Sequence, residues 1–218
     1  TEVRHIYSFF FFFFFYLIIK VNKRNIGEMM YKYFKRNRFS TKSSDIKDDS
    51  GKIVGTIQKK FNNIFQRLVS FFTLGFKFNR FVIYDHNGDV KASVKVKTIM
   101  AQKRFDVTYV SNNGESQVLF DKQSNGRGET YGILKFDGRI LNIHSDENKY
   151  TVIKDSKQDK EIASWKQNGD YAYVEGKSEL YEKNHLLFIL ILHSFANVHV
   201  SHSILNPFNP DTTGSPII

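Results

Sequence analysis

Two short sequences have the residue types of a chemical site but not its spacing. Residues 85–89, DHNGD, offer oxygen ligands for calcium. An EF-hand loop, however, needs glycine at its sixth position and glutamate at its twelfth, whereas here Gly88 is fourth and Val96 is twelfth. Residues 144–146, His-Ser-Asp, have the types of a hydrolase triad, but neighbours in one turn cannot converge on each other. Both sequences therefore predict turns.

Other candidate sites for cofactors and metals are incomplete. Residues 126–132, GRGETYG, miss the Gly-x-Gly-x-x-Gly spacing of a dinucleotide site by one residue. The chain has no cysteine, and no acidic residue lies among the four C-terminal histidines, His185, His193, His199 and His202. We therefore predict no catalytic residue, no metal and no cofactor. An enzyme with an unrecognised pocket stays as an alternative, supported by scattered His and Asp residues.

The positive charge of the chain is concentrated near its N-terminus. The formal net charge is +10, and residues 1–44 hold nine Lys/Arg against two Glu. The rest of the chain is close to balanced, so the basic character belongs to the N-terminal part.

Basic and aromatic residues alternate in the stretch 31–42, YKYFKRNRFSTK. Cations in such a pattern can bind phosphates while the rings lie at a membrane interface. An edge strand with a charged solvated face is the alternative, and a nucleic acid could use the same charges, although we do not expect one as partner. The candidate lipid-binding residues are Lys35, Arg36, Arg38, Lys59, Lys60 and Arg67.

The elements that would position these residues are mainly hairpins. A unit of apolar strand, Asp-centred turn and second strand recurs in residues 46–57, 82–94 and 152–165. Asp with Asn or Gly between alternating apolar positions favours a hairpin. Residues 109–116 and 135–140 add turns of the same kind, so strands recur about every ten residues, as in an antiparallel barrel or sandwich.

Two helices are expected among the strands. Residues 185–192, HLLFILIL, are apolar on nearly every side, and such a helix must be enclosed, most simply by a closed sheet. Residues 59–72 instead place their apolar side chains at helical spacing, which predicts an amphipathic helix. We expect its apolar stripe to plug one end of the barrel, and a free membrane-binding helix is the alternative.

Residues 1–28 do not resemble part of a compact domain. They contain seven consecutive phenylalanines, residues 9–15, inside an apolar run shorter than the roughly 17 residues that a spanning helix requires. The basic cluster of Lys20, Lys23 and Arg24 follows this run, and no small-residue cleavage pattern appears, which disfavours a signal peptide. We interpret residues 1–28 as a non-domain segment, either translated upstream sequence or an anchor. The barrel domain then covers residues 29–196, and residues 197–218 form a tail.

Hairpins with Asp turns, an early amphipathic helix and a late buried helix resemble, in that order, the tubby C-terminal-like superfamily. This group joins the tubby proteins, the phospholipid scramblases and the LURP-one-related proteins. The landmarks are IVGTI, VKASV and EIASW, at residues 53–57, 90–94 and 161–165. The resemblance covers about residues 31–195 and is strongest to small single-domain bacterial members.

The resemblance implies a closed antiparallel barrel of about twelve strands around a central apolar helix. It also implies association with membranes or anionic phospholipids. Neither a phosphoinositide head-group site nor a scramblase calcium motif aligns here, so no family site residue is carried over. We expect a non-enzymatic, monomeric, cytoplasmic protein, peripheral at the membrane, which binds phospholipid or a protein partner.

Overall fold

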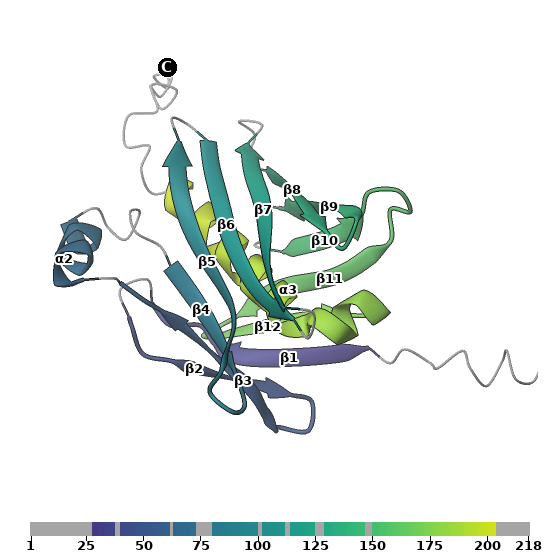
Figure 1. Ribbon diagram of the computed structural model, residues 1–218, viewed down its shortest axis with the longest axis horizontal. Coiled ribbons are helices and arrows are strands. Elements are labelled where there is room, and N and C mark those ends of the chain that lie inside the picture. The colour runs from purple at the N-terminus through teal and green to yellow at the C-terminus, as the bar shows by residue number, and fades with distance from the viewer. Residues whose placement is uncertain are drawn as a thin grey trace, which may run out of the picture.

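The computed structural model describes residues 28–37, 40–61, 63–72, 80–99, 102–111, 114–124, 129–146 and 150–203. Within these residues the chain forms twelve strands and two helices (Figure 1). The strands are β1 (Met29–Phe34), β2 (Ser44–Asp48), β3 (Ile53–Lys59), β4 (Arg80–Asp85), β5 (Val90–Ile99), β6 (Gln102–Ser111), β7 (Gly114–Ser124), β8 (Thr130–Phe136), β9 (Arg139–Ser145), β10 (Thr151–Asp155), β11 (Glu161–Asn168) and β12 (Tyr171–Gly176). The helices are α2 (Ile64–Phe72) and α3 (Glu179–Ser203).

The strands close into one antiparallel barrel. Each strand pairs with its neighbours in sequence, and β1 pairs with β12 from Met29↔Gly176 to Phe34↔Tyr171. Closure leaves the sheet without a free first or last strand. The predicted closed antiparallel barrel is therefore confirmed.

The recurring Asp-centred units form the hairpins β2–β3, β4–β5 and β10–β11. In each turn the first aspartate accepts a hydrogen bond from the backbone N–H two residues on: Asp48 Oδ1 from Ser50 (2.9 Å), Asp85 Oδ1 from Asn87 (2.9 Å) and Asp155 Oδ1 from Lys157 (2.8 Å). Short polar side chains favour turns by this local bonding. Residues 85–89 are thus confirmed as a turn.

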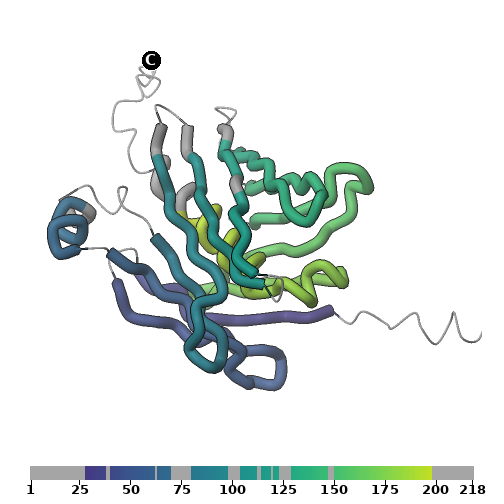
Figure 2. Tube along the Cα trace, viewed as in Figure 1, coloured from purple at the N-terminus to yellow at the C-terminus, as the bar shows by residue number. Residues whose placement is uncertain are grey.

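Helix α3 fills the barrel. Its apolar residues 187–192 are completely buried, and the helix packs against β4, β5, β10, β11 and β12 (Figure 2). The helix is kinked at Asn184, whose side chain donates to Leu180 O (2.9 Å) and accepts from Tyr109 Oη (2.8 Å). The predicted central helix is confirmed. A helix that is apolar on all sides is most stable when a sheet surrounds it, because all of its apolar surface is then removed from water.

Small residues in the inner wall let α3 approach the strands. Gly55, Ala92 and Ala163 lie in the three sequence landmarks, and all three are buried. A Cβ at Gly55 would lie 3.3 Å from Leu186 Cδ2 and would also collide with the backbone oxygen of Tyr84. These landmarks therefore reflect the packing of the helix inside the barrel.

The turns between β2 and β3, β4 and β5, β8 and β9, and β10 and β11 lie at the same end of the barrel as the paired ends Ser111 of β6 and Gly114 of β7. We call this the hairpin end. Near this end β7 separates from β8, since their pairing begins only at Phe120↔Leu134. A groove of about 810 Å³ lies there, and its walls carry both Lys135 and Glu115. This groove therefore has walls of mixed charge.

The predicted amphipathic helix forms as α2, but it begins at Ile64 instead of Lys59 and does not plug the barrel. It connects β3 to β4 and stands to one side of the barrel (Figure 1). Ile64, Phe65 and Leu68 are 85%, 66% and 53% exposed. The prediction of a plug is wrong because α3 and the inward side chains already fill this end, where the cavity measures only about 30 Å³.

Candidate functional site

The predicted site residues gather at the end of the barrel opposite the hairpin turns. Lys35 and Arg36 follow β1, Lys59 ends β3, Lys60 comes next, and Arg67 lies on α2. Because β1 and β3 both run toward this end, Lys35 and Arg36 lie at the same end as Lys59 although they are distant in sequence, and Arg36 and Lys59 line one cavity. Arg38 lies outside the described residues. We call this the basic end.

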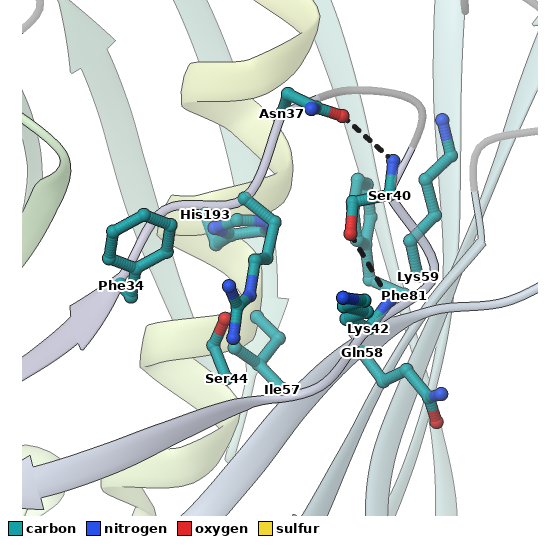
Figure 3. A pocket seen from close by; sticks show the side chains of 11 residues that line it. Phe34, Asn37, Ser40, Lys42, Ser44, Ile57, Gln58, Lys59, Phe81 and His193 are labelled. Atoms are coloured by element: carbon teal, nitrogen blue, oxygen red, sulfur yellow. Dashed lines mark hydrogen bonds between the residues drawn. The ribbon is translucent and has the colours of Figure 1, made fainter.

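A small cavity marks the basic end, beside the buried imidazole of His193 (Figure 3). The connection from β1 to β2 folds back beside it, held by Ser40 N–H donating to Asn37 Oδ1 (3.0 Å). Its lining is Phe34, Arg36, Asn37, Ser40, Lys42, Ser44, Ile57, Gln58, Lys59, Phe81 and His193. These described lining residues include three cations and no carboxylate.

Lys35 and Lys59 are held at the mouth of the barrel instead of reaching into solvent. Lys35 Nζ donates to Gln167 Oε1 (2.7 Å) and lies 5.2 Å from the ring centre of Trp165. Lys59 is only 6% exposed, and its Nζ lies 5.2 Å from the ring centre of Phe61. The aromatic faces stabilise these partly desolvated cations, and both place positive potential inside the mouth.

The other predicted cations face water. Arg36 donates to Ser43 O through Nε (3.4 Å) and Nη2 (3.2 Å), and Lys60 Nζ lies 5.0 Å from the ring centre of Tyr84. Arg67 is exposed on α2. These three cations can meet a flat anionic surface without leaving a buried partner.

A chain of hydrogen bonds lies below the mouth. Trp165 Nε1–H donates to Tyr33 Oη (2.9 Å), and Tyr33 Oη is hydrogen-bonded to His193 Nδ1 (2.9 Å). Asn197 Nδ2 lies 3.0 Å from His193 Nε2 and donates to His193 O (2.8 Å). Four polar side chains from β1, β11 and α3 are thereby satisfied in a buried setting.

Burial keeps His193 neutral. Burial, together with the smaller effect of the nearby charges of Lys35 and Lys59, lowers the pKa of His193 to about 3. Burial also raises the pKa of Tyr33. A neutral histidine with partners on both ring nitrogens stabilises the fold, and its side chain does not gain or lose a proton near pH 7.

The hydrolase-like residues do not converge, and the predicted turn is wrong here, because His144 and Ser145 are the last two residues of strand β9. Ser145 is buried and accepts a hydrogen bond from Thr151 Oγ1 (3.0 Å), whereas the His144 ring packs at a tilt against Tyr131, with ring centres 4.8 Å apart. Successive strand residues point to opposite faces of a sheet. Ser145 and His144 therefore cannot act as nucleophile and base, and among the described residues no group of three or more acidic or histidine side chains could hold a metal ion.

The residues that the sequence reasoning left out are Lys42 and Arg80. Lys42 lines the cavity, and Arg80 O accepts a hydrogen bond from Lys60 N–H (2.9 Å). Lys42 belongs to the basic and aromatic stretch, so its charge was visible in the sequence. Arg80 had no such signal, because only the pairing of β3 with β4 brings it beside Lys60.

A closed barrel of twelve antiparallel strands around an apolar helix, with cations at one end, defines the class of protein. The family described as the Tubby C-terminal like domain matches residues 31–198. The chain belongs to this family, which confirms the resemblance seen in the sequence. Members of this family are in general not enzymes.

No curated protein matches the chain. The X-ray structure of a protein from Arabidopsis thaliana is similar, with 11% identity, coverage of 75% of this chain and 90% of that chain, and a TM-score of 0.43. Among the described residues, neither helix has the length and apolar character needed to cross a bilayer.

Proposed function

We propose that this protein is a non-enzymatic, monomeric tubby-like domain that binds anionic phospholipid at the cytoplasmic surface of a membrane. The observation that carries the proposal is the gathering of cations at the basic end, beside an exposed apolar helix. The binding residues would be Arg36, Lys60 and Arg67 at the surface, with Lys35 and Lys59 adding potential from the mouth.

The cations are numerous enough for useful binding. Each Lys or Arg close to an anionic membrane contributes about 1 kcal/mol, and the effect falls off within the Debye length of roughly 8 Å at physiological salt. Residues 59–72 contain three cations and no acidic residue, so the local charge is not cancelled. Half a dozen such residues would give reversible, salt-sensitive association.

The size of the cavity favours a surface site over an enclosed one. Pockets for small ligands measure roughly 300–1,000 Å³, whereas the cavity at the basic end measures about 30 Å³. That volume holds about one water molecule. Head groups would therefore lie against the exposed cations, outside the barrel.

The test compares charge reversal at the two ends of the barrel. The triple variant Arg36→Glu, Lys60→Glu, Arg67→Glu changes the basic end, and Lys135→Glu, Lys157→Glu, Lys160→Glu makes the same change of charge at the hairpin end, where all three lysines are exposed. Sedimentation with vesicles of phosphatidylserine and phosphatidylcholine should show binding for wild type and for the hairpin-end variant. We expect the basic-end variant to lose most of it.

Equal binding by the two triple variants would refute the site. Absence of any wild-type binding to phosphatidylserine at low salt would refute the function. Stronger binding to single-stranded nucleic acid than to vesicles over the same salt series would indicate that the basic end binds nucleic acid instead of lipid. Capture of a protein by wild type that the basic-end variant loses, without vesicle binding, would instead support a protein partner.

A further inference from the structure

Helix α2 has an apolar side that the barrel leaves uncovered. Among the described residues no strand packs extensively against this helix. Ile64, Phe65 and Leu68 are all more than half exposed. Ile64 and Leu68 are four residues apart and share a side, and Phe65 lies about 100° around the helix from Ile64, so all three fall within one wide apolar stripe. Large apolar side chains grouped in this way mark an interaction surface.

The charges beside the stripe identify what would cover it. Arg67 lies on the same helix three residues after Ile64, and Lys60 lies just before the helix. No residue of α2 is acidic. An apolar stripe flanked by cations is complementary to the boundary between the acyl chains and the anionic head groups of a bilayer.

We propose that α2 inserts in the plane of the membrane, with Ile64, Phe65 and Leu68 among the upper acyl chains and Arg67 at the phosphates. This proposal rests on the lipid binding proposed above and adds a salt-resistant component to it. The nine residues of α2 span only about 14 Å at 1.5 Å per residue. That length is about half of the hydrocarbon core, so the helix lies along the surface and does not cross it.

A second copy of the chain fits this surface less well than a bilayer. A two-fold contact through α2 would bring each Arg67 and Lys60 toward the same cations of the other copy. Like charges across an interface oppose association. The charge that disfavours self-association is the charge that an anionic bilayer neutralises.

Fluorescence with brominated lipids tests the insertion directly. The native chain has one tryptophan, Trp165, which is almost completely buried and so gives a constant background. In Phe65→Trp the emission of the added indole should shift to shorter wavelength on phosphatidylserine vesicles. Lipids brominated on the acyl chains should quench this emission. In the control Ile140→Trp, at an exposed position on β9 beside the turn at the hairpin end, we expect neither change.

A second variant separates insertion from charge. Ile64→Ser with Leu68→Ser should bind phosphatidylserine vesicles at least about tenfold more weakly than wild type near 0.15 M salt. The difference in vesicle affinity between this variant and wild type should be smaller at low salt, where the attraction of the cations to the anionic lipids contributes most of the binding. Its urea midpoint should equal that of wild type, because these side chains do not support the barrel.

The possible outcomes distinguish the two proposals. Vesicle binding without quenching in Phe65→Trp, or unchanged binding by the double Ser variant, would overturn insertion and leave the charge-based function intact. Loss of quenching together with absent wild-type binding would remove both. A blue shift in Phe65→Trp that grows with protein concentration in the absence of vesicles would show that a second copy covers the stripe, and this too would overturn insertion.

Discussion

The two helices among the described residues, α2 and α3, are built from similar residues and have opposite environments. Residues 187–192 of α3 are completely buried inside the barrel, whereas Ile64, Phe65 and Leu68 of α2 are largely exposed beside it. Both helices begin with the same local device. Ser178 Oγ accepts from Tyr181 N–H (3.1 Å), and Asn63 Oδ1 accepts from Gln66 N–H (2.8 Å). Local sequence therefore initiates both helices, whereas the surrounding structure determines whether each helix is buried or exposed.

The comparison separates two kinds of apolar pattern. A helix that is apolar on all sides has one stable solution in water, which is enclosure. A helix with a single apolar stripe can be covered by its own domain, by a partner or by a membrane interface. The pattern of α3 therefore determines its position, while the pattern of α2 leaves its position open.

The largest effect should come from equivalent truncations in the two helices. We expect Leu190→Ala to reduce the free energy of unfolding by about 2–5 kcal/mol, because it leaves a cavity in the filled barrel. We expect Leu68→Ala to change it by less than about 0.5 kcal/mol, since that side chain is already in water. Urea unfolding of both variants beside wild type measures the difference. Similar midpoints for the two variants would mean that the two helices do not differ as described.

The second prediction uses pH to probe α3. His193 has a pKa of about 3 in the folded protein, lowered by burial and by Lys35 and Lys59, against about 6.5 when unfolded. The unfolded state therefore takes up the proton first as the pH falls. We expect the free energy of unfolding to fall by about 2 kcal/mol between pH 7 and pH 5 from this residue.

The control for this pH effect is the variant His193→Gln, in which the free energy of unfolding should fall less steeply as the pH decreases. Burial also lowers the pKa of His185, so part of the slope should remain in the variant. The carboxyl of Asp48, whose pKa is held low by hydrogen bonds led by that from Ser50, contributes only at more acidic pH. An identical slope for wild type and His193→Gln would show that His193 does not titrate as described.

A smaller effect should follow from removing the two caps. Ser178→Ala should lower the free energy of unfolding by about 1 kcal/mol, because α3 unfolds only with the barrel. Asn63→Ala should leave the unfolding midpoint unchanged and weaken α2 alone. Hydrogen exchange of the amide of Gln66 is the readout, and faster exchange in Asn63→Ala with an unchanged midpoint is the expected result. A lowered midpoint would instead couple α2 to the barrel.

The smallest effect should come from deleting residues 1–28. We propose that the barrel folds without them, since β1 begins at Met29 and pairs on both sides with β12 and β2. The deletion removes one exposed ion pair, Glu28 with Lys177 (2.9 Å), and such pairs contribute little. An equal urea midpoint is expected. A loss of folding would show that the apolar run is structural.

The sequence predicted the features that depend on neighbouring residues. Asp48, Asp85 and Asp155 each bond to backbone groups within a few residues, so their turns could be recognised without the rest of the fold. The apolar run of α3 could likewise be recognised from the sequence, because a helical segment with no polar side must be enclosed. From that requirement and the recurring hairpins the barrel followed.

Only the tertiary structure decided where α2 lies and how the basic end is assembled. Tyr33, Trp165 and His193 are joined across 132 and 160 positions of sequence, and no local pattern specifies such a contact. Lys35 and Lys59 meet at one mouth because β1 and β3 run in the same direction around a closed barrel. The stripe of α2 stays exposed because α3 has already filled the space that it would occupy. Packing in a closed volume is a property of the whole chain, and the spacing of a few residues cannot express it.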